Sequence, residues 1–229
     1  LTKSNESTTW LNKWTRMEKI AIEELKAATN ETLTEGITVR KVVESLRNRD
    51  HLFVANSMPV RDIDTFLITT NKNVKIYANR GVSGIDGTMS SALGVATMGD
   101  KVTLIIGDLS FYHDMNSLFI AMRYKLPVTI VLINNNGGGI FSFLPQANDE
   151  KHFEHLFGTP INIEFKHAVK MFNGHYELVT EESSLERALE ESYDRQQFTV
   201  IEVQTNRKQN VDWHRKLWHK ISQRLEQHD

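Results

Sequence analysis

Two apolar runs constrain the fold of this chain more than any other feature of its sequence. Residues 102–106 (VTLII) and residues 128–133 (VTIVLI) are almost uninterrupted in their apolar character. A strand with one face in water alternates apolar and polar side chains, whereas a strand of a parallel sheet is covered by helices on both faces and loses that alternation. The two runs therefore predict central strands of a parallel, helix-covered sheet.

Shorter patterns between and around these runs predict the other elements. Further strands are expected at residues 52–55, 74–78, 176–179 and 198–203, which gives six in all. Helical spacing of apolar residues predicts helices at residues 6–28, 39–49, 89–98, 114–124, 165–172, 183–193 and 211–225, and Ser183 with Glu186 predicts a capping box. The fold class is therefore α/β: a doubly wound, mainly parallel six-stranded sheet with helices on both faces.

Length and composition fit one large domain with an appendage. The chain has 229 residues, of which 40% are hydrophobic and 24% charged. It begins with a polar, helix-like segment and carries no initiator Met, so we expect a piece of a longer protein. Residues 1–33 are predicted to be a helical lead-in from a preceding domain, and residues 34–229 a cofactor-binding domain with a C-terminal helix.

Charge and cysteine content exclude several classes of function. The formal net charge is −2 with no concentration of basic residues, so nucleic acid is not an expected partner. The absence of cysteine excludes disulfides, thiolate metal sites and cysteine nucleophiles, and a cytoplasmic location is expected. No apolar stretch approaches the roughly 20 residues of a membrane-spanning helix, so no membrane span is expected.

Polar residues follow the two strongest strands at the point where such a fold binds its ligands. Gly107-Asp108-Leu109-Ser110 comes directly after the run at 102–106, and residues 134–139 (NNNGGG) follow the run at 128–133. Parallel strands have their carboxyl ends at one edge of the sheet, which is where ligands bind. A carboxylate, an amide and a glycine carbonyl supply the oxygen ligands that Mg²⁺ prefers, and glycine lets the backbone approach a diphosphate.

Each motif alone has a simpler interpretation. An aspartate after a strand is commonly a helix cap, and Asn/Gly runs are commonly turns. The combination favours a ligand site, because Asn135 follows Asp108 by the length of one helix and one strand. The sequence therefore predicts a Mg²⁺-diphosphate site built on Asp108 and Asn135.

These motifs resemble those of a known enzyme family. Gly-Asp followed at this distance by Asn-Asn is similar to the thiamine-diphosphate signature of the pyruvate oxidase and acetolactate synthase superfamily. Gly107-Asp108-Leu109-Ser110 and residues 79–87 (NRGVSGIDG) resemble more closely the synthases of menaquinone biosynthesis. Residues 56–61 (NSMPVR) and 134–141 (NNNGGGIF) extend the likeness, which covers residues 36 to 205.

The resemblance implies a role for each motif residue. Asp108, the side chain of Asn135 and the carbonyl of Gly137 would hold Mg²⁺, or Mn²⁺ in its place. Thiamine diphosphate would contact these three residues and a further set made up of Ser57, Ser83, Gly84, Ile85, Gly107, Leu109 and Ser110. Ile85 would prop the cofactor in its bent form. Substrate carboxylates would be gripped by Arg61 and Arg80, with Asn56, Ile140 and Phe141 lining the pocket.

The resemblance also implies the reaction and the partners. The whole enzyme would decarboxylate 2-oxoglutarate and add the product to isochorismate. The glutamate that activates the cofactor would lie on the pyrimidine-binding domain of another subunit, so no catalytic residue is expected on this chain. The full-length protein would be a homo-oligomer, a dimer or a tetramer, and this chain alone would be inactive. An acetolactate-synthase-type enzyme and a non-catalytic assembly module are the alternatives.

Overall fold

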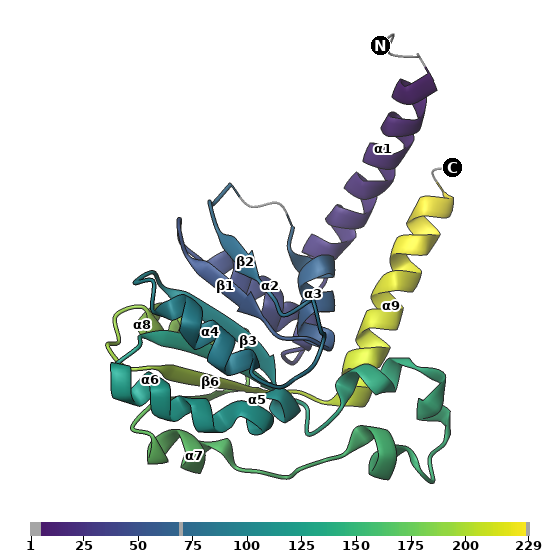
Figure 1. Cartoon of the computed structure of the whole chain (residues 1–229). Coiled ribbons are helices and arrows are strands. Elements are labelled where there is room, and N and C mark those ends of the chain that lie inside the picture. The colour runs from purple at the N-terminus through teal and green to yellow at the C-terminus, as the bar shows by residue number, and fades with distance from the viewer. Residues whose placement is uncertain (1–5, 69–70, 228–229) are drawn as a thin grey trace.

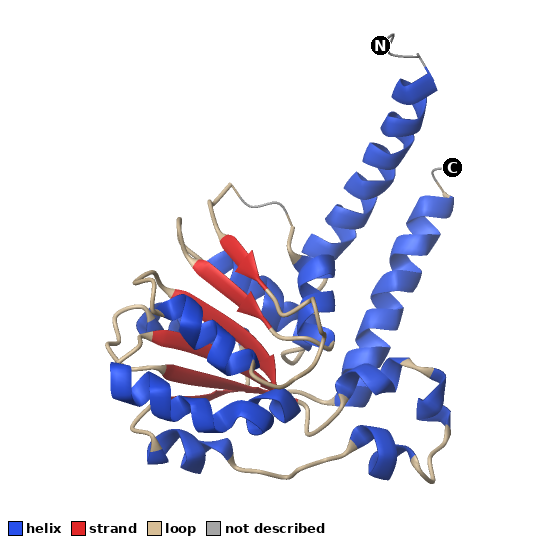
Figure 2. Ribbon diagram, viewed as in Figure 1, coloured by secondary structure: helices blue, strands red, loops and turns tan. Residues whose placement is uncertain are grey.

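The computed structural model describes residues 6–68 and 71–227. One sheet forms the centre of the molecule, with helices packed against each of its faces (Figure 2). The strands are β1 (His51–Val54), β2 (Lys75–Tyr77), β3 (Val102–Gly107), β4 (Val128–Asn134), β5 (His175–Val179) and β6 (Thr199–Gln204). Every pairing is parallel, so the predicted fold class and its six strands are confirmed.

Helices connect and flank these strands (Figure 1). They are α1 (Glu6–Ala27), α2 (Glu35–Ser45), α3 (Met58–Phe66), α4 (Thr88–Ala96), α5 (Asp108–Asp114), α6 (Leu118–Tyr124), α7 (Phe165–Met171), α8 (Glu182–Ser192) and α9 (Arg207–Glu226). Short helical turns at Gly139–Phe143, Pro145–Asn148 and Glu154–Gly158 occupy the long connection after β4.

Alternate residues of the central strands face two separate cores. Leu52, Ile105 and Val131 pack with apolar residues of α2, α3 and α8, while Phe53 and Leu104 pack with those of α4, α5 and α7. Both sets are buried, which is the reason that these strands show no alternation of apolar and polar residues. The uninterrupted runs were therefore a sound guide to a sheet covered on both faces.

The strand order locates the ligand-binding crevice. The order is β2-β1-β3-β4-β6-β5, so the chain moves outward in one direction after β1 and in the other after β3. In such a sheet the crevice lies beyond the carboxyl ends of the strands at this reversal. Asn56 and Ser57 lie just beyond the end of β1, and Gly107 and Asp108 lie at the end of β3. The topology thus brings two of the sequence motifs to one place.

Some expected elements differ in the structure. The helix predicted at 114–124 is a tighter turn at Met115–Ser117 followed by α6, and it is preceded by a separate helix, α5, which was not predicted and begins at Asp108 itself. The α3 helix was not predicted. The capping box of α8 is formed by Glu181 and Ser184 instead of Ser183 and Glu186, because the helix begins two residues earlier than a cap at Ser183 would require.

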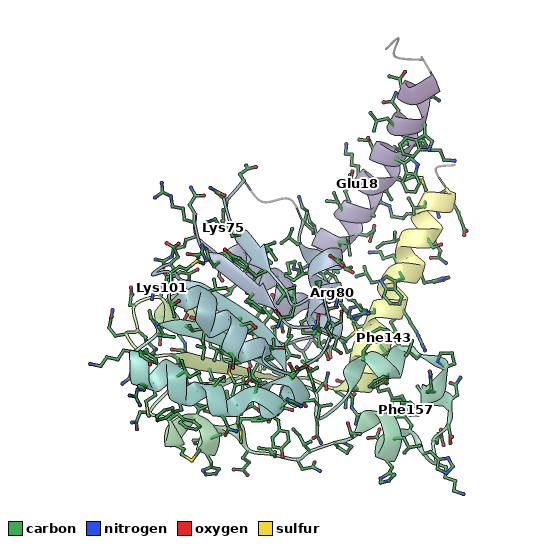
Figure 3. The ribbon with its side chains drawn as sticks, in the orientation of Figure 1. Glu18, Lys75, Arg80, Lys101, Phe143 and Phe157 are labelled. Carbon is green, nitrogen blue, oxygen red and sulfur yellow. The ribbon has the colours of Figure 1, made fainter. Side chains whose placement is uncertain are left out.

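The two terminal helices lie side by side and extend beyond the sheet (Figure 1). Glu24 of α1 forms salt bridges with two residues of α9, Arg224 at 2.6 Å and Lys220 at 2.7 Å. Phe143 packs against the rings of His214 and Trp218 on the same helix (Figure 3). The division of the chain after residue 33 stays a prediction. Within the described residues, no helix is both long and apolar enough to cross a bilayer.

Candidate functional site

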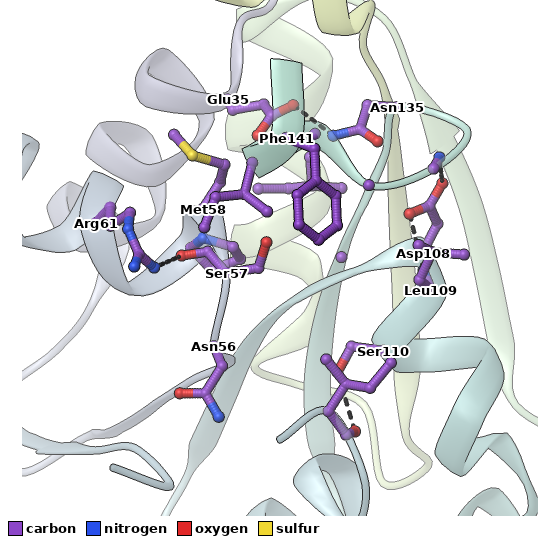
Figure 4. Close-up of a pocket in the computed structure, with 18 of the residues that line it drawn as sticks. Glu35, Asn56, Ser57, Met58, Arg61, Asp108, Leu109, Ser110, Asn135 and Phe141 are labelled. Carbon is purple, nitrogen blue, oxygen red and sulfur yellow. Dashed lines mark hydrogen bonds between the residues drawn. The ribbon is translucent and has the colours of Figure 1, made fainter. Parts of the chain in front are cut away.

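A pocket of about 450 Å³ opens at the carboxyl ends of β1, β3 and β4 (Figure 4). Every residue that the sequence predicted for the site lines this pocket except Gly84. Gly84 does not line the pocket, but its carbonyl accepts a hydrogen bond at 2.6 Å from the side chain of Asn56, which does. The fold therefore gathers residues from four separate sequence motifs around one cavity.

Asp108 connects two strand ends. It is buried at the start of α5, where Oδ1 accepts from the Leu109 N–H at 2.8 Å and Oδ2 accepts from the Gly137 N–H at 2.7 Å. Burial raises the pKa of Asp108 from 3.8 to about 6, although these two backbone N–H groups and the charge of Arg207 act in the opposite direction. A desolvated carboxylate of this kind is stabilised by a bound cation.

The loop after β4 carries two oxygen atoms that are candidate ligands of a cation beside Asp108. Asn135 Oδ1 is buried and has no hydrogen-bond partner among the described residues. Gly137 has a φ of 141°, and a Cβ at this position would clash with the Gly158 carbonyl oxygen. Its own carbonyl accepts from the Gly139 N–H at 3.0 Å, which leaves one lone pair available. Glycine is therefore required at 137 both for its conformation and for the close approach to Gly158.

The loop is fixed in place by a neighbouring asparagine. Asn136 Oδ1 accepts from the backbone N–H groups of Ile161 and Asn162, at 3.1 and 3.0 Å. The Gly138 N–H donates to the Gly158 carbonyl at 2.8 Å. The segment that carries Asn135 and Gly137 is thus held from outside the pocket, which leaves Asn135 Oδ1 and one lone pair of the Gly137 carbonyl available to a ligand.

The corner between β1 and α3 is strained. Ser57 has a φ of 75° and a ψ of −131°, which is a conformation that costs a non-glycine residue on the order of 1–3 kcal/mol. Its carbonyl accepts from Arg61 Nη1 at 2.7 Å. Strained backbone of this kind persists only where the surrounding structure enforces it, and it is found most often at ligand-binding and active sites. Here it directs the Ser57 backbone and the exposed Arg61 side chain to the pocket.

Asn56 joins this corner to the loop at residues 78–87. Its Nδ2 donates to the carbonyls of Asn79 and Gly84, and its Oδ1 accepts from Arg80 Nη1 at 2.8 Å. The side chain lines the pocket, but its polar atoms are occupied in holding the loop and Arg80. Arg80 retains its other guanidinium N–H groups for an anionic ligand.

Ile85 lies on the loop at residues 78–87 and lines the pocket. Its carbonyl already accepts from the hydroxyls of Thr88 and Ser110, at 3.2 and 3.3 Å, so both lone pairs of this oxygen are occupied without a ligand. Ser83 also lines the pocket. On the opposite wall, Phe141 packs against Phe157 with ring centroids 5.7 Å apart, and Ile140 lies next to it.

The sequence interpretation missed several residues of the pocket. They are Glu35, Met58, Pro59, Ile133, Gly138 and Gly139. Gly138 and Gly139 belong to the glycine run and could have been included with Gly137. No local signal marks Glu35, which is the first residue of α2 and lies 100 positions before its hydrogen-bond partner Asn135.

Glu35 is the other buried carboxyl group of the site. Burial raises its pKa from 4.5 to about 7, and the charge of Asp62 adds to this effect. Its Oε1 accepts from Asn135 Nδ2 at 2.7 Å (Figure 4). Clusters of three or more His, Asp or Glu with metal-binding geometry are absent from residues 6–68 and 71–227. A site at Asp108 would therefore depend on neutral oxygens and on oxygens from the ligand.

The residues present fit a divalent cation bound to a diphosphate. They offer one desolvated carboxylate, one unpaired amide oxygen and one glycine carbonyl, and Mg²⁺ commonly takes such a partial set and completes its octahedron with phosphate oxygens and water. Gly107 has open space around it, and the N-terminus of α5 lies beside Asp108. The arrangement has the chemistry of a cation-diphosphate site.

Comparison with known proteins agrees with this geometry. Residues 63–203 match the family described as "Thiamine pyrophosphate enzyme, C-terminal TPP binding domain". The chain is 50% identical to a 2-succinyl-5-enolpyruvyl-6-hydroxy-3-cyclohexene-1-carboxylate synthase of Oceanobacillus iheyensis, over 96% of this chain and 38% of that protein. Synthases of the same description from Listeria innocua and Geobacillus thermodenitrificans are 45% and 46% identical, over 94% and 97% of this chain. The chain spans 38% of the length of each of these relatives.

The fold is also found in solved structures. The crystal structure of benzoylformate decarboxylase from Polynucleobacter necessarius superposes with a TM-score of 0.63 at 18% identity, covering 79% of this chain and 34% of that one. This likeness concerns the fold alone. Because the family match extends over well more than half of the chain, the chain belongs to the thiamine pyrophosphate enzymes, and residues 63–203 are their C-terminal TPP-binding domain.

Proposed function

We propose that this chain is the diphosphate-binding part of a 2-succinyl-5-enolpyruvyl-6-hydroxy-3-cyclohexene-1-carboxylate synthase of menaquinone biosynthesis. The names and identities of its relatives support this assignment. The observation that carries the cofactor site is the buried, unpaired Oδ1 of Asn135 in the pocket that Asp108 also lines. An orphaned buried amide oxygen costs on the order of 1–3 kcal/mol, and a bound cation would remove that cost.

In this proposal Asp108, Asn135 Oδ1 and the Gly137 carbonyl bind Mg²⁺, with Mn²⁺ as a substitute. Gly107, Leu109 and Ser110 line the path of the diphosphate. When bound, thiamine diphosphate stabilises a substrate carbanion by acting as an electron sink. The side chain of Ile85 would support the cofactor, while Ser57, Ser83 and Gly84 would shape its binding surface.

Arg61 and Arg80 provide the positive charge that substrates with several carboxylates require. A guanidinium binds a carboxylate through two parallel hydrogen bonds and stays charged at any physiological pH. Arg80 is oriented by Asn56, and Arg61 by the Ser57 carbonyl. Ile140 and Phe141 add an apolar wall. The assigned substrates are 2-oxoglutarate and isochorismate, and the reaction is a decarboxylating transfer that forms a carbon–carbon bond.

The site requires a second domain for turnover. We assign the glutamate that activates the cofactor to a pyrimidine-binding domain of another subunit, so the active enzyme is a homo-oligomer and this chain alone is inactive. A helical lead-in at residues 1–33 and a cytoplasmic location belong to the same proposal.

Turnover assays separate this assignment from its alternatives. An enzyme made of this chain and its pyrimidine-binding domain should release CO₂ from 2-oxoglutarate and consume isochorismate, and the isolated chain should do neither. Condensation of pyruvate in place of 2-oxoglutarate would indicate an acetolactate-synthase-type enzyme. Decarboxylation of 2-oxoglutarate by the isolated chain would contradict the requirement for a second domain.

A further inference from the structure

The side chain of Asn135 is held by a residue that belongs to none of the sequence motifs. Glu35 Oε1 accepts a hydrogen bond from Asn135 Nδ2 at 2.7 Å, and the Thr205 hydroxyl lies 3.4 Å from the same oxygen. Glu35 is 1% exposed and lines the pocket with Asn135 (Figure 4). On the other side of the amide, Asn135 Oδ1 is buried and has no partner within the described part of the chain. The two ends of one amide therefore have opposite surroundings.

The direction of this amide determines whether Asn135 can bind a cation. An asparagine amide has nearly the same shape when its oxygen and nitrogen are exchanged, so only its hydrogen-bond partners select the orientation. Glu35 Oε1 acts as an acceptor in this contact, and it therefore attracts the NH₂ group of Asn135 and leaves the amide oxygen facing away. With the NH₂ group on Glu35, the oxygen is left for the pocket that Asp108 lines.

We infer that Glu35 is a positioning residue that holds the amide oxygen of Asn135 towards the bound cation. The inference rests on the proposed function and adds to it a residue from outside the diphosphate motifs. The loss of a partner that orients a metal ligand in this way typically lowers metal affinity by about 10- to 100-fold.

Glu35 is itself held firmly. It is the first residue of α2, whose N-cap Thr34 accepts from the Ile37 N–H at 3.2 Å, and the Glu35 N–H donates to Asn210 Oδ1 at 3.3 Å. The N-terminal end of a helix favours a negative charge, which offsets part of the cost of burying the carboxylate.

A glycine makes room for the contact between Glu35 and Asn135. A Cβ at Gly139 would lie 2.5 Å from Asn135 Nδ2 and 3.7 Å from Glu35 Oε1. The third glycine of the run thus admits the pair, which gives Gly139 a role distinct from that of Gly137.

A purely structural pair would account for the hydrogen bond but not for the orphaned oxygen. A buried amide that served packing alone would be expected to satisfy both of its ends, because an unsatisfied buried acceptor costs on the order of 1–3 kcal/mol. The geometry instead satisfies the donor end and leaves the acceptor end free, which is the arrangement of a preorganised ligand.

The first test is NMR of the Asn135 side-chain amide in the 229-residue chain without ligand. Its resonances are assigned by their loss in Asn135→Asp. The account predicts that one of the two protons is shifted downfield and exchanges slowly with water, and that both features are lost in Glu35→Met. An unshifted, rapidly exchanging amide in the wild type would overturn the inference, whether or not Glu35→Met folds.

The second test is Mn²⁺ binding in the presence of thiamine diphosphate, measured by electron paramagnetic resonance on the complete enzyme. Glu35→Met should weaken Mn²⁺ binding by about 10- to 100-fold, whereas Glu35→Gln, which keeps an acceptor oxygen but removes the charge, should recover most of that loss. Asp62→Asn is the matched control: Asp62 is a buried carboxyl that interacts electrostatically with Glu35 and does not line the pocket, and this variant should bind Mn²⁺ as the wild type does.

The outcomes distinguish a failure of the proposed role of Glu35 from a failure of the proposed metal site. Wild-type affinity in Glu35→Met would overturn the role of Glu35 and leave the metal site standing. Equal losses in Glu35→Met and Glu35→Gln would show that charge, and not orientation, is the contribution of Glu35, and would also overturn the inference. Failure of the wild-type enzyme to bind Mn²⁺ with thiamine diphosphate would instead remove the proposed function itself.

Discussion

The Gly137 N–H donates a 2.7 Å hydrogen bond to Asp108 Oδ2, and this contact joins the motifs that follow β3 and β4. The two residues lie 29 positions apart and become neighbours only because parallel strands end at the same edge of the sheet. The contact fixes the carboxylate relative to the glycine loop before any ligand arrives. Preorganisation of this kind reduces the conformational cost of binding.

Replacement of Gly137 by alanine should damage the loop. The residue has a φ of 141°, and an added Cβ would meet the backbone carbonyl of Gly158, which has little freedom to move. We expect Gly137→Ala to lower the free energy of unfolding by at least about 1 kcal/mol. Gly94→Ala is the control, because Gly94 lies inside α4 with open space around it. That variant should be more stable than the wild type by about 0.5 kcal/mol in urea denaturation, and destabilisation of both variants alike would contradict the account.

The stability of the ligand-free chain should depend on pH through Asp108. Burial raises its pKa from 3.8 to about 6, so between these values the folded state holds a proton that the unfolded state has released. Stability from this group is therefore fully present below about pH 4 and is lost as pH rises through 6.

The Asp108 contribution can be isolated by comparison with Asp108→Asn. Between pH 5 and pH 7.5, the wild type should lose about 1 kcal/mol of unfolding free energy more than the variant does, as measured by urea denaturation without metal. The difference between the two proteins cancels the part of the Glu35 contribution that comes from burial and from Asp62, and leaves only the smaller part that comes from the charge of Asp108. Parallel pH profiles for the two proteins would show that Asp108 has an ordinary pKa.

Arg80 should contribute to substrate affinity and not to cofactor binding. Its Nη1 is engaged by Asn56 Oδ1 at 2.8 Å, which orients the remaining guanidinium donors. In the complete enzyme, Arg80→Lys should raise KM for the anionic substrate at least about tenfold, since an ammonium group cannot form the paired hydrogen bonds. Binding of thiamine diphosphate should be unchanged.

The control for this prediction is Arg215→Lys, which alters an exposed arginine of α9 outside the pocket. Its KM should equal that of the wild type. An equal effect of both substitutions would indicate a general electrostatic contribution instead of a specific contact by Arg80.

The sequence predicted the sheet well because its evidence is local and repeated. Uninterrupted apolar runs identified β3 and β4, and the polar residues after them were correctly expected at one edge of the sheet. Helix boundaries were less accurate. The start of α5 at Asp108 was missed because the apolar residues of its first turn, Leu109 and Phe111, are two positions apart and show no helical spacing.

What the sequence could not supply are contacts between distant segments. Glu35 reaches Asn135 across 100 positions, and neither residue carries a local signal of the other. Asn56 was expected to line the pocket, and it does, but its role in holding Arg80 and the Gly84 carbonyl depends on side-chain orientations that only the folded chain defines.

Calorimetric titration of thiamine diphosphate into the complete enzyme, with Mg²⁺ and with the metal removed by EDTA, tests the central claim most directly. We predict saturable binding of thiamine diphosphate that requires Mg²⁺. In Asp108→Ala the affinity for thiamine diphosphate should fall by at least about 100-fold, because that variant lacks the one charged ligand of the site. Binding of equal strength with and without Mg²⁺, or in Asp108→Ala, would contradict the account.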